Sequence, residues 1–185
     1  MNWLTNLESA KEEASVSQKP VLLQFEMPGC GGCKKLYEET YTDEKTAAEM
    51  SDNFVLLKVD LIKDREIRRQ FSAYWTPSIY FLDHTGKSYF YFNGYLPPGE
   101  FRIILRLGYA ETMIPKGKYD DAYRFLSSDL EDFSELNPLL PKLLASRGIT
   151  DYIRTKDKST FMRVMKDIQI KYPSSLEAKM YFWNE

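Results

Sequence analysis

The sequence is poor in the residue types that bind metals and crosslink secreted proteins. Its 185 residues include two cysteines, Cys30 and Cys33, and one histidine, His84. A single cysteine pair excludes the disulfide framework of small secreted domains. A structural zinc site needs about four ligands, mostly Cys and His. Only His84 could join the pair, and it lies in a turn-forming segment, where histidine is ordinarily solvated. We therefore expect no metal unless a second chain supplies ligands.

The chain also lacks long apolar runs and basic runs. No stretch approaches the roughly 18 apolar residues of a transmembrane helix, so no membrane span is expected. The first residues lack the basic and apolar segments of a signal peptide, which favours a cytoplasmic location, or a periplasmic one if an export signal has been removed. The formal net charge is −2, and no run is rich in lysine or arginine, so nucleic acid is not an expected partner.

What the sequence does contain is typical of a folded α/β domain with an addition. Hydrophobic residues make up 43% and charged residues 28%, as in globular proteins. The length allows one large domain, or a standard domain with a small appendage. Apolar periodicity and turn residues predict strands over residues 21–26, 54–60, 78–82 and 87–92, and helices over residues 7–15, 30–41, 45–50, 64–71 and 97–107.

The pattern changes after about residue 111. No further strand is predicted, and residues 118–185 have the pattern of three or four helices. Pro115 and Gly117 would interrupt a helix, which places a boundary near residues 112–116. We therefore expect an α/β domain over residues 1–112 and an all-α extension over residues 113–185.

The most informative segment is Cys30-Gly31-Gly32-Cys33, between a predicted strand and a predicted helix. Cysteines at i and i+3 in the first turn of a helix place both sulfurs on one side, close enough to bond. The first sulfur lies over unpaired backbone N–H groups at the positive end of the helix dipole. Such sites favour the thiolate, which is the reactive form of cysteine. The segment therefore indicates thiol–disulfide exchange, with shared metal binding and inert cysteines as the alternatives.

These residues resemble the thioredoxin superfamily over roughly residues 3–108. The resemblance rests on short segments around the cysteines and along the later strands: the strand over residues 21–26, Cys30 to Lys34, the strand over residues 54–60, Thr76-Pro77, the hairpin at Gly86, and Gly94. The opening, from Trp3 to residues 19–23, is similar to the branch related to the C-terminal domain of the membrane thiol:disulfide interchange protein. The resemblance implies a thioredoxin fold, with a mixed central sheet flanked by helices.

The resemblance also implies roles for individual residues. Cys30 would be the exposed attacking thiol and Cys33 the more buried resolving thiol, so that Cys30 forms a mixed disulfide that Cys33 then releases. Pro77 would be cis and would bring the Thr76 backbone beside the sulfurs, where it pairs with an extended substrate peptide. Apart from the resemblance, the position of Trp75 beside Thr76 makes it a candidate for the floor of a substrate groove, although packing in the core or at its rim is the commoner role. Protein disulfides are the implied substrates, and no cofactor is implied.

Three departures from the thioredoxin pattern affect these expectations. Thioredoxins carry Trp before the first cysteine and Gly-Pro between the two, where this chain has Gly29 and Gly31-Gly32, and we expect a more open loop. The buried aspartate that assists proton transfer corresponds to Gln24, which cannot take a proton. That role is vacant or passes to Glu26, two residues along, which we expect on the other side of the strand. Lys58 matches the lysine that accompanies the aspartate, so Glu26 and Lys58 are the candidates for a proton relay.

The helical tail faintly resembles a tetratricopeptide unit at residues 117–122 and 172–178. Three repeats, the usual minimum for a free-standing array, cannot be counted. We expect the tail to pack on the first domain or to extend its substrate surface. Two functions are then in competition. One is a thiol:disulfide oxidoreductase, acting as a protein disulfide reductase through Cys30 and Cys33. The other is a binding or adaptor module whose helical tail recruits a protein partner, with a regulatory or idle dithiol.

Overall fold

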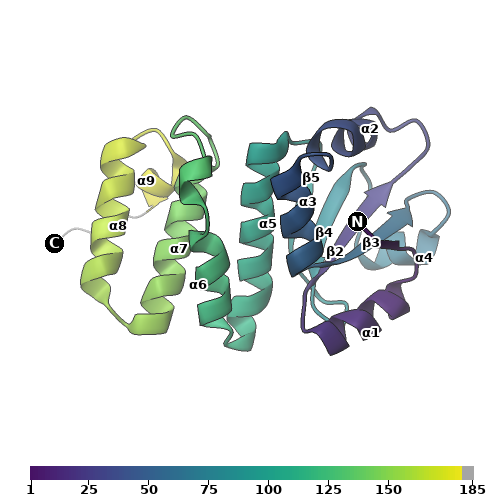
Figure 1. Ribbon diagram of the computed structural model, residues 1–185, viewed down its shortest axis with the longest axis horizontal. Coiled ribbons are helices and arrows are strands. Elements are labelled where there is room, and N and C mark those ends of the chain that lie inside the picture. The colour runs from purple at the N-terminus through teal and green to yellow at the C-terminus, as the bar shows by residue number, and fades with distance from the viewer. Residues whose placement is uncertain (181–185) are drawn as a thin grey trace. The chain divides into compact units, whose positions relative to one another are not determined.

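The computed structural model describes residues 1–180, and the chain separates into two compact units, Met1–Thr112 and Met113–Glu185 (Figure 1). Strands and helices alternate in the first unit. In chain order they are β1 (Trp3–Leu4), α1 (Leu7–Ser17), β2 (Val21–Glu26), α2 (Gly31–Lys35), α3 (Glu44–Asn53), β3 (Val55–Asp60), α4 (Arg65–Gln70), β4 (Ser78–Leu82), β5 (Ser88–Asn93) and α5 (Pro98–Met113). A short π-helix, Leu36–Thr40, continues directly from α2. All four strands predicted from the sequence are present.

The five strands form one mixed sheet in the order β1-β3-β2-β4-β5 (Figure 1). Strands β1, β3 and β2 are parallel, whereas β4 runs antiparallel to β2, and β5 antiparallel to β4. The central strand β2 is buried from Val21 to Phe25, which explains its nearly continuous apolar sequence. This arrangement confirms the predicted α/β fold with a mixed central sheet and flanking helices.

Alternate residues of β2 face opposite sides of the sheet and divide the core of the first unit in two. On one side, Leu23 and Phe25 pack in a cluster with side chains of α1 and with Ile67 and Phe71 around α4. On the other side, Phe81 of β4 lies against α5, where a Cβ at Gly108 would come within 2.3 Å of the Phe81 ring. Only glycine fits there, so α5 packs directly on the sheet.

A buried ion-pair cluster joins α3 to α5 within the first unit. Glu49 Oε1 accepts hydrogen bonds from Arg102 Nε at 2.6 Å and from Arg106 Nη2 at 2.9 Å. The Arg106 side chain is 0% exposed and that of Arg102 is 7% exposed. Charges buried this deeply are stable only when they are paired. The Glu49 carboxylate therefore holds the two guanidinium groups in the core.

The turn between β4 and β5 is organised by Asp83. Its carboxylate accepts hydrogen bonds from the Thr85 backbone and hydroxyl, the Lys87 N–H and the Tyr89 hydroxyl. Burial acts to raise the pKa of Asp83, but these hydrogen bonds outweigh it and hold that pKa below its ordinary value. Gly86 completes the turn with φ of +86°, a conformation that favours glycine.

All regular secondary structure in the described part of the second unit is helical (Figure 1). It contains α6 (Tyr119–Ser127), α7 (Leu140–Thr155), α8 (Lys158–Lys171) and α9 (Leu176–Met180), with single 3-10 turns at Ile114–Lys116 and Leu130–Asp132. Its core includes five buried side chains: Ala145, Phe161, Met165, Ile168 and Ala178. Helix α7 approaches α8 closely at Gly148, where a Cβ would lie 2.9 Å from Val164. Among residues 1–180, no helix combines the length and the apolar character that a membrane crossing requires.

Candidate active site

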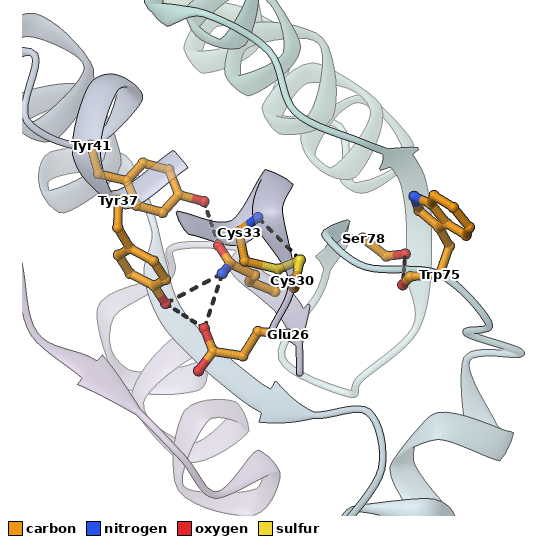
Figure 2. The surroundings of a disulfide bond; sticks show 8 residues. Glu26, Cys30, Cys33, Tyr37, Tyr41, Trp75 and Ser78 are labelled. Atoms are coloured by element: carbon orange, nitrogen blue, oxygen red, sulfur yellow. Dashed lines mark hydrogen bonds between the residues drawn. A yellow bond between two sulfur atoms is a disulfide. The ribbon is translucent and has the colours of Figure 1, made fainter. Parts of the chain in front are cut away.

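The two cysteines form a disulfide at the start of α2 (Figure 2). Cys30 caps the helix in an extended conformation and Cys33 lies within its first turn, so that their Cα atoms are 5.3 Å apart. Cys30 is partly exposed, whereas Cys33 is 5% exposed. The Cys33 backbone N–H donates a hydrogen bond to Cys30 Sγ at 3.1 Å. Because a hydrogen bond to the charged form favours that form, the same N–H stabilises a Cys30 thiolate after reduction.

The segment containing Pro77 lies against the glycines between the cysteines. The Thr76–Pro77 peptide bond is cis. A Cβ at Gly32 would come within 2.8 Å of Pro77 Cδ, whereas a Cβ at Gly31 would meet nothing within 4 Å. The loop is therefore open at Gly31, as expected, but at Gly32 the missing side chain instead allows close contact with Pro77.

Thr76 has hydrogen-bonding groups that the chain does not use. Its side chain is nearly buried, and its Oγ1 has no hydrogen-bond partner in the described part of the chain. Its backbone makes no hydrogen bond within residues 1–180 either, whereas the Pro77 carbonyl accepts one from the Gly94 N–H at 2.8 Å. Buried polar groups are nearly always hydrogen-bonded. The unused groups of Thr76 are thus available to a bound molecule.

Trp75 and its neighbour Tyr74 are on the surface, 59% and 78% exposed. The Trp75 carbonyl accepts a hydrogen bond from the Ser78 hydroxyl at 2.6 Å, as Figure 2 shows. Core packing is therefore excluded for Trp75. The described groove beside the disulfide is not lined by Trp75 either, so its role as the floor of a substrate groove stays a prediction.

A groove of about 460 Å³ lies beside the disulfide. Its walls include Glu26, Met27, Cys30, Cys33, Tyr37 and Asp60. Glu26 and Asp60 are register partners at the ends of the parallel strands β2 and β3. Hydrogen bonds from the backbone N–H groups of Lys63 and Ile62 hold the pKa of Asp60 below its ordinary value. Across residues 1–180, no three or more His, Cys, Asp or Glu side chains gather where they could hold a metal ion.

Glu26 belongs to a hydrogen-bonded network with three other side chains (Figure 2). Its Oε2 accepts from the Tyr37 hydroxyl at 2.6 Å and from Gln24 Nε2 at 3.3 Å. The same Gln24 nitrogen lies 3.3 Å from the Tyr37 oxygen, and the Tyr41 hydroxyl donates to Gln24 Oε1. The expectation that Glu26 faces away from Gln24 is wrong, because residues i and i+2 of a strand share a face.

The two tyrosines of this network remain protonated at neutral pH. Burial, followed by the hydrogen bond and the charge of Glu26, raises the pKa of Tyr37. Burial also raises the pKa of Tyr41, with smaller contributions from Tyr37 and Glu26. Their rings meet edge to face, with centroids 5.4 Å apart. Both hydroxyls therefore act as hydrogen-bond donors, Tyr37 to Glu26 and Tyr41 to Gln24.

Lys58 and Tyr37 differ in how they relate to Glu26. Lys58 is the register partner of Gln24 on β3, but it makes no side-chain hydrogen bond or ion pair within the described residues. A relay through Lys58 therefore stays a prediction. Tyr37 has no part in the relay predicted from the sequence, yet it contacts Glu26 directly. Its position four residues after Cys33 is the signal that could have identified it, because that spacing places two side chains on one helix face.

Comparison with known proteins agrees with this geometry. A family model described as a thioredoxin-like domain matches residues 7–108. The chain is 28% identical over 99 residues to "Thiol:disulfide interchange protein DsbD" of Campylobacter jejuni, a match that covers 51% of this chain and 17% of that protein. It is 30% identical over 87 residues to the protein of the same name from Ralstonia nicotianae, a match that covers 45% of this chain and 14% of that protein. The chain thus spans less than a fifth of the length of these relatives.

The fold is also shared with solved structures. A thioredoxin from Thermus thermophilus superimposes with a TM-score of 0.52 at 20% identity, covering 58% of this chain and 85% of that one. A structure titled "DsbH Oxidoreductase" gives the same TM-score at 16% identity, covering 58% and 83%. The family match includes both cysteines, the groove and the Thr76–Pro77 segment. On the evidence of this match and of the sheet that carries the cysteine pair, the chain belongs to the thioredoxin-like domain family.

Proposed function

We propose that this protein is a thiol:disulfide oxidoreductase that reduces protein disulfides through Cys30 and Cys33. The observation that supports it most strongly is the disulfide between a partly exposed Cys30 and a nearly buried Cys33. Thiol–disulfide exchange needs one accessible sulfur for attack and a second sulfur within bonding distance for release. The exposed groove beside the pair gives a substrate access to Cys30.

The reaction runs in two displacement steps. The Cys30 thiolate attacks one sulfur of a substrate disulfide, forms a mixed disulfide and expels the other substrate sulfur as a thiolate. Cys33 then loses its proton and attacks Cys30 Sγ, which closes the Cys30–Cys33 disulfide and releases the second substrate thiolate. Two electrons pass from the dithiol to the substrate, and the released thiolates take up protons. A dithiol reductant must then reduce the enzyme for the next cycle.

The Thr76–Pro77 segment is the proposed binding site for the substrate backbone. The Thr76 backbone makes no hydrogen bond within the described residues, and an extended peptide can therefore add to it as a strand adds to a sheet edge. Exposed Trp75 lies next in sequence and offers an aromatic surface to substrate side chains. In the cytoplasmic location expected from the sequence, the exchange would run toward reduction of the substrate.

Turnover with insulin and a dithiol reductant tests the proposal. The wild-type protein should speed insulin reduction above the rate of the reductant alone, and Cys30→Ser should abolish that gain. Cys33→Ser should instead accumulate mixed disulfides with its substrates, because the second displacement cannot occur. Absence of turnover, together with no trapped mixed disulfide in Cys33→Ser, would falsify the oxidoreductase function.

The second candidate is a binding or adaptor module in which the helical unit recruits a protein partner. A groove of about 560 Å³ on that unit favours it, with walls that include Leu136, Pro138, Pro141, Tyr172 and Pro173. Leu136 in this wall is 92% exposed, so a bound partner could cover its apolar side chain. In this case the protein would show no insulin turnover, and Cys30→Ser would leave partner binding unchanged.

A further inference from the structure

Closing the Cys30–Cys33 disulfide requires a base, because Cys33 must lose its proton before it attacks. Cys33 is only 5% exposed, and it borders the groove beside the disulfide. Gln24, the residue at the position of the family's buried acid, is fully buried and carries an amide that cannot accept the proton. Among the side chains, those that line the groove with Cys33 are therefore the candidates for this base.

Two carboxylates line this groove with the cysteines, and they differ in what they bind. Asp60 Oδ1 already accepts two backbone N–H groups of the turn that follows it, at 2.9 and 3.1 Å. Glu26 accepts hydrogen bonds only through Oε2, and its Oε1 has no partner within residues 1–180. Glu26 thus lines the groove together with both cysteines and keeps one carboxylate oxygen that no described residue occupies, so it is the better candidate to accept a proton, directly or through one water.

The position of the Glu26 carboxylate depends on Tyr37. The hydroxyl donates to Glu26 Oε2 at 2.6 Å, the shorter of the two hydrogen bonds that Glu26 receives (Figure 2). Burial and the Glu26 charge raise the pKa of Tyr37, so the hydroxyl remains a donor throughout the neutral range. A donor that does not ionise stabilises the charged form of its acceptor and fixes its orientation.

We propose that Tyr37 is a positioning residue that holds Glu26 as the proton acceptor for Cys33. This inference rests on the proposed oxidoreductase function and adds a residue to it. In the resolving step the proton passes from Cys33 Sγ to Glu26, the sulfur's electron pair forms the bond to Cys30 Sγ, and the substrate sulfur leaves with the electrons of the broken bond. Glu26 later returns the proton to solvent through the groove.

Other charged groups around Glu26 come from each element that borders the groove. Asp60 on β3 is a like charge that disfavours a second anion nearby. Lys34 on α2 also lines the groove, but it lies 3.7 Å from Glu38 and is 72% exposed, so solvent screens its effect. Lys58 on β3 forms no ion pair within the described residues. These neighbouring charges are the same in the wild type and in each variant described below, so differences between their pH profiles report on the substituted residue.

The two displacement steps can be observed separately with 5,5′-dithiobis(2-nitrobenzoate). Attack by Cys30 on this small disulfide releases one coloured thiolate, and attack by Cys33 on the mixed disulfide releases a second. Stopped-flow absorbance between about pH 5 and 9 gives a pH profile for each phase. Glu26→Gln should slow the second phase by about a hundredfold at neutral pH and remove the acid limb of its profile.

Tyr37→Phe should slow the second phase by about tenfold and move its acid limb to higher pH, because the carboxylate form has lost a donor. The double variant should be no slower than Glu26→Gln alone, since Tyr37 acts only through Glu26. Tyr95→Phe is the matched control, because it removes a hydroxyl that donates to Glu39 rather than to Glu26. It should leave both phases within about twofold of wild type.

Three outcomes would overturn the inference. In the first, the acid limb of the second phase does not move in Tyr37→Phe. In the second, the double variant is slowed by the product of the two single effects. In the third, the acid limb moves as far in Tyr95→Phe as in Tyr37→Phe. Insulin turnover keeps this result distinct from the proposed function. If the wild type turns over insulin and Cys30→Ser does not, the oxidoreductase function stands even when Tyr37→Phe is unaffected. If the wild type does not turn over insulin and Cys33→Ser traps no mixed disulfide, the function itself fails.

Discussion

Replacing Gly32 by alanine should destabilise the protein, whereas the same change at the neighbouring Gly31 should not. A Cβ at Gly32 would lie 2.8 Å from Pro77 Cδ, while one at Gly31 would meet nothing within 4 Å. Neither glycine has a positive φ, so alanine can adopt both backbone conformations. The two variants carry the same chemical change, and the difference between them isolates the contact with Pro77.

The magnitude follows from the geometry at each position. Alanine in a compatible conformation stabilises by about 0.4–1 kcal/mol, because it restricts the unfolded chain. We expect this gain for Gly31→Ala. At Gly32 the added carbon starts at 2.8 Å and must separate by about 0.7 Å to reach an ordinary contact. Overpacking of this kind costs about 1–3 kcal/mol. Gly32→Ala should therefore be about 1–3 kcal/mol less stable than Gly31→Ala.

Urea unfolding of the oxidised proteins, monitored by tryptophan fluorescence, measures the difference in unfolding free energy between the two variants. The difference is calculated from the two transition midpoints, with the same dependence of the free energy on urea concentration for both. The insulin assay should show a parallel effect. A shift of the Pro77 segment away from the cysteines should lower kcat/KM of Gly32→Ala by about tenfold or more, since small misplacements near a reacting group are costly. Equal stability of the two variants would show that Pro77 does not pack on Gly32 and would refute the reasoning.

Two further predictions concern the fold of the first unit. Glu49→Gln removes the negative charge opposite the buried Arg102 and Arg106. The free energy of unfolding, measured in urea, should therefore fall by about 3–5 kcal/mol. As a control, Glu44→Gln changes an exposed residue of the same helix and should alter the free energy of unfolding by less than about 1 kcal/mol. Asp83 has a folded-state pKa below the ordinary value of 3.8, so its stabilisation is present above that pH and is lost as the pH falls through the folded pKa. Asp83→Asn should flatten the acid-side slope of unfolding free energy against pH, and an unchanged slope in this variant would contradict the assignment.

The cysteine pair could be predicted from the sequence because its determinants are local. An apolar run before Cys30, glycines within the turn and helical spacing up to Cys33 together fix the geometry of one short segment. The proximity of Gly32 to Pro77 is different, because it depends on how β4 is placed beside β2. No local pattern encodes that contact, and only the resemblance to thioredoxins implied it.

The features that the sequence did not predict depend on which side chains become buried and on which side of a helix or strand each side chain lies. Arg102 and Arg106 are four residues apart on a helix, a pattern typical of a solvated face, yet both are buried against Glu49. Glu26 lies on the same side of β2 as Gln24, contrary to our expectation, because side chains two residues apart in a strand share a face. Tyr37 belongs to no recognised motif. Its helical spacing from Cys33 places it on the cysteine face, but its contact with Glu26 depends on how β2 lies beside the helix.

The neutral Gln24 and the carboxylate of Glu26 together change how a proton can leave the site. A carboxylate at the fully buried Gln24 position would be costly to ionise, and its proton would have no direct path to solvent. Glu26 is partly exposed and borders the groove, so it can exchange protons with water once the substrate has left. The Tyr37 hydroxyl fixes one oxygen of this partly exposed carboxylate by a hydrogen bond. The same hydroxyl therefore orients the carboxylate that we propose as the proton acceptor of the resolving step.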